Sequence, residues 1–285
     1  MMRRCPACDA VGARTLWRGQ GRGGVRSLWR CAGCGAAFVD PVPAVETLAD
    51  WYGEDYFNRC YGGDRDAAVA ASGAWLDRWL PMPTGARRLL DVGCGVGDLC
   101  LAARQRGWES VGVEPAAAAA ARAAARGVVV RHAEATAAWN GSPGEAEDWD
   151  AIIFRDSVAH IRDLRAVLQG AVRHLAPGGV LLIRTPNHHP GLLTLARRVG
   201  RLRDPSGILH LPAQIVHFDR SSLQALLSGL GLHEVRVVAE TEGGAGGGEV
   251  RYARSPALDR LWRFALRRWR RQGEPEELTG RGRHP

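Results

Sequence analysis

From residue 87 onward, short apolar runs alternate with longer segments of helical periodicity. The predicted strands lie at 87–93, 109–115, 128–132, 149–157, 177–187 and 232–240, with 248–254 as a seventh candidate. The predicted helices reach to about residue 107, to residue 126, across 161–175 and across 221–231, the last capped by serine. This alternation predicts an α/β fold: a doubly wound, mainly parallel seven-stranded sheet with helices on both faces.

Two shorter units precede this sheet. Residues 1–40 contain the stretches "TLWR" and "SLWR", each of which predicts a short strand. Residues 41–86 begin with prolines and then predict helices at 44–52 and 66–80, the second ended by Pro81 and Pro83. We therefore expect a small N-terminal unit, a helical connection and a large domain over 87–255.

Charge divides the chain in a way that the net value of +8 conceals. Arginines concentrate in the first 34 and the last 35 residues, while the middle is acidic, and the chain contains no lysine. Basic ends on an acidic body indicate a nucleic-acid partner less than a basic body would. The first residues carry charge with no apolar stretch behind them, so no secretory signal is indicated and a cytoplasmic location is expected.

Four of the seven cysteines form two C-x2-C pairs, Cys5 with Cys8 and Cys31 with Cys34, separated by 22 residues. Each pair lies in a turn of small residues, which aims two thiolates at one metal, and two such turns complete a tetrahedron. Redox-active pairs are the competing interpretation. A site closed by four thiolates has no open position for water, so we expect structural rather than catalytic zinc.

A glycine-rich loop, "DVGCGVGD", follows the first strand of the predicted sheet. In a doubly wound fold this is where a cofactor binds. A dinucleotide fingerprint needs G-x-G-x-x-G, but here Asp98 stands where the last glycine belongs. Asp91 precedes the loop, and a carboxylate at that point would repel a pyrophosphate and attract a cation. These features favour S-adenosylmethionine, which carries an ammonium and a sulfonium and no phosphate.

The second predicted strand ends in Glu114, about twenty residues after the loop. An acid there accepts hydrogen bonds from ribose hydroxyls. Glu114 fits a nicotinamide dinucleotide and S-adenosylmethionine equally well, so it does not distinguish the two cofactors.

With these motifs in order, the chain resembles a class I S-adenosylmethionine-dependent methyltransferase. The resemblance rests on "LLDVGCGVGD", "VGVEP", "DAIIFRDSVAHI", "LAPGGVLLIRTPN" and "HFDRSSLQALLSGLGL", over about 87–240. The first 57 residues resemble a bacterial subgroup of that family with a four-cysteine zinc ribbon. The resemblance implies transfer of a methyl group to a small-molecule acceptor, at oxygen, nitrogen or carbon, in natural-product or sugar biosynthesis for example.

The resemblance also implies roles for individual residues. Asp91 and the loop residues would surround the methionine and ribose parts of the cofactor, and Glu114 would hold the ribose hydroxyls. Glu134 would lie near the adenine, Arg155 and Asp156 at the cofactor's edge, and Tyr56 with Phe57 would close over it or pack in the core. The full implied cofactor set is Tyr56, Asp91, Gly93, Cys94, Gly95, Gly97, Glu114, Pro115, Glu134, Arg155 and Asp156.

Methyl transfer needs positioning above all, and a base only where the nucleophile arrives protonated. His160, just after the fourth predicted strand, is the candidate base, since an unperturbed histidine pKa of about 6.5 suits that role. Its alternative role is to anchor the loop by hydrogen bonding. His188, His210 and His217 are candidate substrate residues, in or beside a predicted substrate lid at 188–220.

Two other functions are considered. A nucleic-acid methyltransferase would use the zinc ribbon and the arginine-rich ends on phosphates, but the fourth strand ends in "FRDS" and not in the Asn/Asp-Pro-Pro-aromatic signature of enzymes that methylate base amino groups. Residues 257–272 form a basic amphipathic helix that would contact a membrane or a second subunit. That helix would suit a lipid-like substrate or a non-enzymatic sensor of the cofactor. The tail after Gly273 is expected to be disordered.

Overall fold

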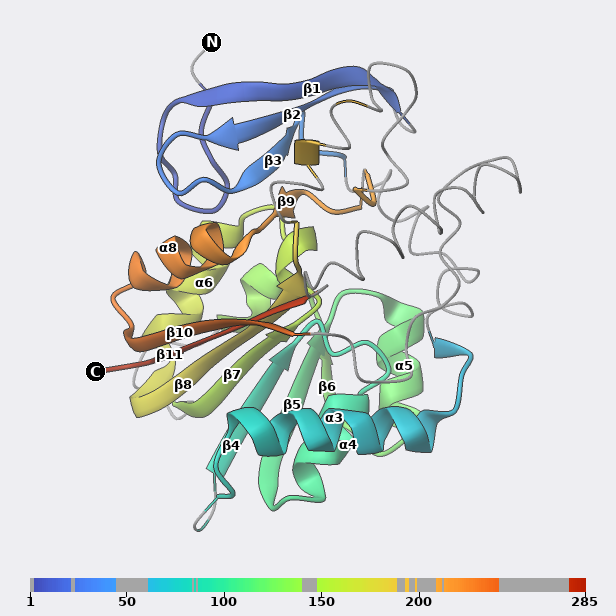
Figure 1. The fold of residues 1–285 in the computed structure, drawn as a ribbon. Helices are drawn as coiled ribbons and strands as arrows, with labels where there is room; N and C mark the ends of the chain where they lie inside the picture. Colours follow the sequence, from blue (N-terminus) through green and yellow to red (C-terminus); the bar gives the residue numbers. More distant parts are fainter. Residues whose placement is uncertain are drawn as a thin grey trace.

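The structure is a computed structural model with two β-sheets, and Val216–His217, within the predicted lid segment, adds one strand to the smaller sheet (Figure 1). It describes residues 3–21, 24–44, 61–83, 85, 87–139, 148–188, 193–194, 198, 209–211, 213–240 and 277–285.

The larger sheet has the strand order β10-β11-β8-β7-β4-β5-β6. Its strands are β4 (Arg87–Val92), β5 (Trp108–Glu114), β6 (Val129–His132), β7 (Trp149–Arg155), β8 (Leu175–Pro186), β10 (His233–Glu240) and β11 (Glu277–Arg283). The four pairings among the five strands from β8 to β6 are parallel, whereas β11 runs antiparallel to both β8 and β10. The predicted fold class, a seven-stranded and mainly parallel sheet, is confirmed.

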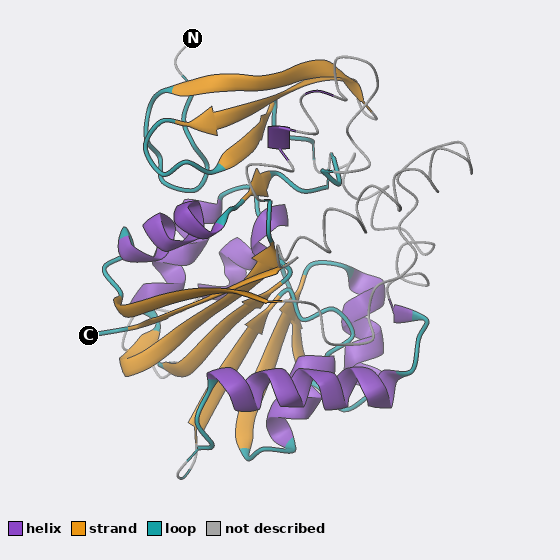
Figure 2. Ribbon diagram, in the orientation of Figure 1, coloured by secondary structure: helices purple, strands orange, loops and turns teal. Residues whose placement is uncertain are grey.

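Helices cover both faces of this sheet (Figure 2). They are α3 (Arg65–Trp79), α4 (Asp98–Arg104), α5 (Ala117–Ala125), α6 (Leu164–Arg173) and α8 (Arg220–Ser228), with short 3-10 turns η1 (Ala135–Trp139) and η2 (Val158–His160). Alternate strand residues face opposite sides. Leu89, Ile153 and Leu182 pack with α3 and α4, while the intervening residues face α6 and α8.

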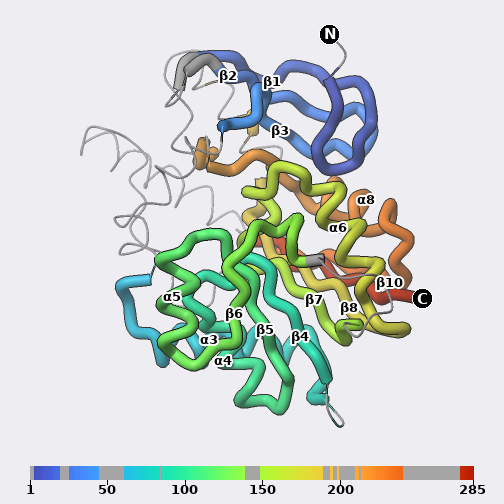
Figure 3. Tube along the Cα trace, turned by 180° about the vertical axis from the view of Figure 1, so that it is seen from behind, coloured from blue at the N-terminus to red at the C-terminus, as the bar shows by residue number. Residues whose placement is uncertain are grey.

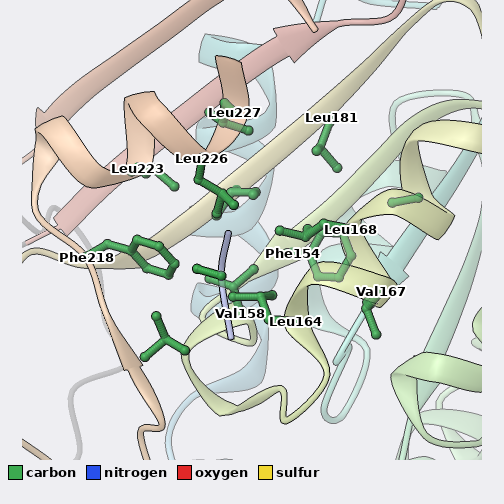
Figure 4. Close-up of a cluster of buried hydrophobic side chains, with 14 of the residues drawn as sticks. Phe154, Val158, Leu164, Val167, Leu168, Leu181, Phe218, Leu223, Leu226 and Leu227 are labelled. Atoms are coloured by element: carbon green, nitrogen blue, oxygen red, sulfur yellow. The ribbon is translucent and has the colours of Figure 1, made fainter. Parts of the chain in front are cut away.

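The largest apolar cluster lies on the α6 and α8 face (Figure 4). Phe154 of β7 and Leu181 of β8 lie fully buried against Leu168 of α6 and Leu227 of α8. Each fully buried large apolar side chain stabilises the fold by about 1.5–3 kcal/mol relative to an exposed one. This cluster fixes the spacing of the strands whose carboxyl ends carry the site.

The smaller sheet contains the N-terminal unit, in the order β1-β2-β3-β9, with all pairings antiparallel. Its strands are β1 (Ala13–Gly21), β2 (Gly24–Cys31), β3 (Ala37–Asp40) and β9 (Val216–His217). The predicted strands "TLWR" and "SLWR" lie within β1 and β2. Figure 3 shows this sheet, seen from behind, above α6 and α8.

The N-terminal unit shares its interior with the large domain. Phe38 of β3 and the two cysteines Cys5 and Cys31 belong to the same buried cluster as the α6 and α8 face. The ribbon also pairs with the predicted lid segment through β9, because β3 pairs Ala37 with His217 and Phe38 with Val216. Ribbon and core are thus packed as one body at this point.

The tail prediction is wrong for its last part. Residues 277–283 form β11, which inserts between β8 and β10 near one edge of the large sheet. The stretch "ELTGRGR" has little apolar character of its own, so its strand is selected by long-range pairing and not by local pattern. Gly280 fits there because an added Cβ would lie 2.7 Å from Leu227 Cδ1.

Smaller details also differ from the predictions. The helix predicted at 221–231 is α8, and its N-cap is Asp219: the Asp219 carboxylate accepts from the Ser222 amide at 2.8 Å, while the Ser222 hydroxyl bonds back to the Asp219 amide at 2.9 Å. The predicted helix at 66–80 is confirmed as α3. Most of the predicted helix at 44–52, the strand at 248–254 and the helix at 257–272 lie outside the described residues.

Among the described residues, no helix has the length and apolar character that crossing a bilayer requires.

Candidate cofactor and zinc sites

The four cysteines of the ribbon meet at one point. Their sulfur atoms all lie within 4.8 Å of one another, with Cys5 Sγ 3.7 Å from Cys34 Sγ and Cys8 Sγ 3.5 Å from Cys31 Sγ. A tetrahedral zinc with bonds of about 2.3 Å to sulfur needs sulfurs about 3.8 Å apart. The donor set and spacing are compatible with a structural zinc held by Cys5, Cys8, Cys31 and Cys34.

The glycine loop is a tight turn between β4 and α4. Gly93, Gly95 and Gly97 all have positive φ, at 83°, 56° and 81°. A Cβ atom added at Gly93 would lie 2.6 Å from Ser157 Cβ, and one added at Gly97 would lie 2.6 Å from Val128 Cγ2. A Cβ atom added at Gly95 would collide with the Tyr61 hydroxyl. The glycines are therefore required by the fold of the loop itself as well as by the approach of a ligand.

Asp91 lies at the end of β4 with 2% of its surface exposed. Its Oδ1 atom is buried without a hydrogen-bond partner, and its Oδ2 atom is 3.9 Å from Cys100 Sγ. Burial raises the pKa of this carboxyl to about 7, against an opposing effect of the Arg155 charge. An orphaned buried carboxylate oxygen needs a donor, and a ligand ammonium would supply one.

Glu114 ends the neighbouring strand β5 and is turned back onto the loop. Its carboxylate accepts from the Gly95 amide at 2.9 Å and from the Ala116 amide at 3.0 Å. A carboxylate has about four acceptor positions, so two remain for ribose hydroxyls. Burial raises the Glu114 pKa, and the nearby exposed Glu134 adds to that effect. Both acids thus lie at the β5–β6 edge, where the sequence places the ribose and adenine.

The remaining predicted cofactor residues lie in three places: beside Glu114 and the glycine loop, at the end of β7, and outside the described residues. Pro115 follows Glu114, and its carbonyl lies 3.0 Å from His132 Nε2. The Cys94 side chain is packed in an apolar cluster with Cys100 and Val128. Arg155 and Asp156 lie at the end of β7, the strand next to β4. Tyr56 and Phe57 lie outside the described residues.

His160 is held on the rim beyond β7. Its Nδ1 lies 2.9 Å from the Ala213 carbonyl oxygen, which must accept, so the proton lies on Nδ1 and Nε2 is the basic nitrogen. Burial lowers the pKa of His160 to about 4. The imidazole is therefore neutral at physiological pH. Both predicted roles, base and loop anchor, are compatible with this arrangement.

The three predicted substrate histidines cluster next to His160. The rings of His188 and His217 meet edge to face, with centroids 4.5 Å apart, and His217 Nε2 lies 3.0 Å from the Leu209 carbonyl. The Nδ1 atoms of both rings are buried without hydrogen-bond partners. Burial lowers the pKa of His210 as well. Four neutral histidines thus lie together where β8, the lid and η2 meet.

Two site residues were missed by sequence reasoning. Tyr61 lies over the glycine loop, with its hydroxyl in the space that a Gly95 side chain would need. Ser157 packs on Gly93 and donates from its hydroxyl to the Val92 carbonyl at 2.6 Å. An aromatic residue just before α3 was a usable signal for Tyr61, whereas Ser157 is recognisable only through the packing.

With this geometry established, comparison with known proteins identifies the class. Residues 61–237 match the family model described as methyltransferase domain. The match covers more than half of the chain, so the chain belongs to this family.

Among curated proteins, the chain is similar to ubiquinone biosynthesis O-methyltransferases. It is 31% identical to the one from Rhizobium etli over 127 residues, 43% of this chain and 50% of that protein. It is 33% identical to the one from a Bradyrhizobium species over 105 residues, 36% of this chain and 41% of that protein. The chain thus spans about half the length of the curated relatives it matches.

Solved structures share the fold over most of the chain. A Haemonchus contortus phosphoethanolamine N-methyltransferase 2 in complex with S-adenosyl-L-methionine aligns with a TM-score of 0.57 at 16% identity, covering 94% of this chain and 71% of that one. An Archaeoglobus fulgidus S-adenosylmethionine-dependent methyltransferase aligns with a TM-score of 0.52 at 19% identity, covering 80% and 97%. The orphaned Asp91 oxygen, the Glu114 carboxylate and the glycine loop fit S-adenosylmethionine as the cofactor.

Proposed function

We propose that the protein is an S-adenosylmethionine-dependent methyltransferase that methylates a hydroxyl oxygen of a small-molecule acceptor. The observation that carries the proposal is the pairing of two sites at one edge of the sheet. A buried carboxylate with an unsatisfied oxygen, Asp91, lies at the end of β4, and a neutral imidazole with a defined tautomer, His160, lies just beyond β7.

Different residues at this edge would bind the cofactor and deprotonate the acceptor. Bound S-adenosylmethionine supplies a methyl group on a sulfonium, which is open to in-line attack. Asp91 would orient the cofactor through its ammonium, and Glu114 through the ribose. His160 would take the proton of the acceptor hydroxyl at Nε2, while Nδ1 keeps its own proton and donates it in a hydrogen bond to the Ala213 carbonyl.

Oxygen is favoured as the acceptor atom by two observations. A hydroxyl attacks well only when a base takes its proton, and His160, with its pKa lowered to about 4, is neutral above about pH 4, so its Nε2 can accept that proton although it is a weaker base than a free imidazole. The curated relatives that match about two fifths of the chain are O-methyltransferases by name. His188, His210 and His217, which cluster next to His160, would contact the acceptor from the same side as the base.

The test measures release of S-adenosylhomocysteine with a panel of catechols, phenols, alcohols and primary amines. We expect turnover with a hydroxyl compound and a loss of about 10²–10⁴-fold in kcat for His160→Gln. The matched control is His174→Gln, because His174 also places Nδ1 2.9 Å from a backbone carbonyl but lies at the amino end of β8. Turnover of amines alone, or equal loss in both variants, would contradict the proposal.

A further inference from the structure

Two arginines stand side by side at the carboxyl ends of the central strands. Arg155 of β7 and Arg184 of β8 are register partners. Strand alternation puts both on the α3 face of the sheet, the same face as Asp91. Neighbouring guanidinium groups repel, so each needs a compensating negative charge.

Arg184 has its compensation within the protein. It donates to the Glu277 carboxylate of β11 at 2.5 Å, and its Nε lies 3.6 Å from Asp156 Oδ1. The C-terminal strand therefore serves, among other things, to neutralise this arginine.

Among the described residues, Arg155 has no close ion pair of this kind, although Asp156, Asp91 and Glu277 act on its charge from a longer distance. Within the part of the chain that the structure describes, no carboxylate comes within 4.0 Å of its guanidinium. Its Nη1 donates to the Ser72 hydroxyl of α3 at 2.5 Å, and its Nε is buried without a hydrogen-bond partner. Ser72 in turn donates to the Ala68 carbonyl at 2.7 Å, which leaves the hydroxyl oxygen to accept from Arg155 and holds the guanidinium in place.

A second unsatisfied donor lies beside Arg155. The guanidinium carbon is 5.7 Å from the centroid of the Trp75 ring, and the Trp75 indole nitrogen is also buried without an acceptor. Burial lowers the pKa of Arg155, but a guanidinium does not lose its proton under ordinary conditions. A buried cation with orphaned donors is costly unless a ligand completes it.

We propose that Arg155 binds an acidic group of the methyl acceptor, a carboxylate or a phosphate, so that the substrate is an anion. This inference rests on the proposed function and adds the substrate class. Arg155 lies on the β7–β8 half of the sheet, whereas the loop, Glu114 and Glu134 place the cofactor over β4, β5 and β6. A guanidinium binds a carboxylate or phosphate in a two-pronged geometry that a neutral acceptor cannot use.

The cofactor's own carboxylate is the other source of the same chemistry, and the experiment separates the two sources. Inorganic phosphate is titrated into the enzyme saturated with S-adenosylhomocysteine, by calorimetry, for the wild type and for Arg155→Gln. We expect a phosphate site in the wild type that weakens at least tenfold in Arg155→Gln. The proposal moves Arg155 from the cofactor's edge, where the resemblance implied it, to the acceptor, so affinity for S-adenosylhomocysteine should stay within about twofold in the same variant.

Two further variants keep the test interpretable. Arg155→Lys retains charge and should retain part of the phosphate affinity even if Arg155→Gln unfolds. Arg88→Gln is the matched control, since Arg88 is also a partly buried arginine over a tryptophan, 4.4 Å from the Trp149 ring centroid, but at the amino end of β4. It should bind phosphate as the wild type does.

Equal phosphate binding in the wild type and in both Arg155 variants, or none in the wild type, would overturn the proposal. So would a tenfold loss of S-adenosylhomocysteine affinity in Arg155→Gln, since Arg155 would then hold the cofactor carboxylate. The proposed function is judged separately, by the loss of turnover in His160→Gln compared with His174→Gln, using a hydroxyl acceptor that the panel identifies.

Discussion

Arg30 of the ribbon donates to the Asp219 carboxylate of the large domain at 2.9 Å, across the interface between the two units. Both side chains are largely buried, and the same Asp219 carboxylate caps α8. The ribbon is thus attached to the helix that follows the lid, in addition to the β3–β9 pairing.

Removal of the zinc is expected to destabilise the whole domain. Cys8→Ser or a chelator should lower the melting temperature in a single transition, because Cys5 and Cys31 share the buried cluster of α6 and α8. Zinc content by atomic absorption checks the site, and calorimetry checks the transition. Two separate transitions, or an unchanged melting temperature in metal-free protein, would contradict this coupling.

Breaking the Arg30–Asp219 pair should cost about 3–5 kcal/mol of unfolding free energy, because it leaves a buried carboxylate without its cation. Arg30→Gln is compared with Arg4→Gln, whose partner Asp9 is exposed and whose loss should cost at most about 1 kcal/mol. Urea unfolding followed by tryptophan fluorescence measures both. Similar losses in the two variants would show that the interface pair contributes nothing beyond a surface pair.

Cofactor binding should release protons near neutral pH. The free Asp91 carboxyl has a pKa raised to about 7 by burial, so at pH 6.5 it is mostly protonated, and binding a cationic ammonium requires the ionised form. Calorimetric titration with S-adenosylmethionine at pH 6.5, in buffers of different ionisation enthalpy, should show release of most of one proton. At pH 9 Asp91 is already ionised and should release no proton, whereas the α-amino group of the free cofactor, largely neutral there, should take up a proton when it binds as the ammonium.

Asp91→Asn should abolish this proton release and weaken cofactor affinity at least tenfold. Asp77→Asn is the control, since Asp77 of α3 is an exposed carboxylate that pairs with Arg106. Proton release that persists in Asp91→Asn would assign it to another group.

Local sequence pattern was sufficient for β4, β7 and β8, because their apolar runs are continuous and largely buried on both faces. It was sufficient for the cysteine cluster too, since the spacing itself defines the ligands. It failed for β11, where "LTGRGR" carries no apolar period and the strand exists through its pairing with β8 and β10. It also could not show that Arg184 has a carboxylate partner while Arg155 has none close by among the described residues, because the partner Glu277 lies 93 residues from Arg184.

Overpacking β11 tests its place in the core. Gly280→Val should lower the unfolding free energy by about 1–3 kcal/mol, because an added Cβ already meets Leu227 Cδ1 at 2.7 Å. The control is Gly63→Ala, where the nearest neighbour of an added Cβ among the described residues is a flexible arginine nitrogen at 3.6 Å. Equal stability of the two variants would place residues 277–283 outside the folded core.

The buried histidines should make the protein sensitive to mild acid. Burial lowers the pKa of His160 and of His217 to about 4, against about 6.5 in an unfolded chain. Between pH 6.5 and 4 the unfolded state therefore binds more protons, so stability falls as pH falls, by up to about 1.4 kcal/mol per pH unit for each histidine. His188 and His210 face the same cluster and act in the same direction.

Asp91 opposes this trend, because its raised pKa makes the folded state bind the extra proton in the same range. Urea unfolding between pH 7 and 4.5 is therefore best measured in an Asp91→Asn background, where the loss of stability should be steeper than in the wild type. His217→Gln in that background should flatten the slope by the contribution of one histidine. His233→Gln, an exposed histidine on β10, should leave the slope unchanged. A slope unaffected by His217→Gln would mean that the cluster is not neutral in the folded protein.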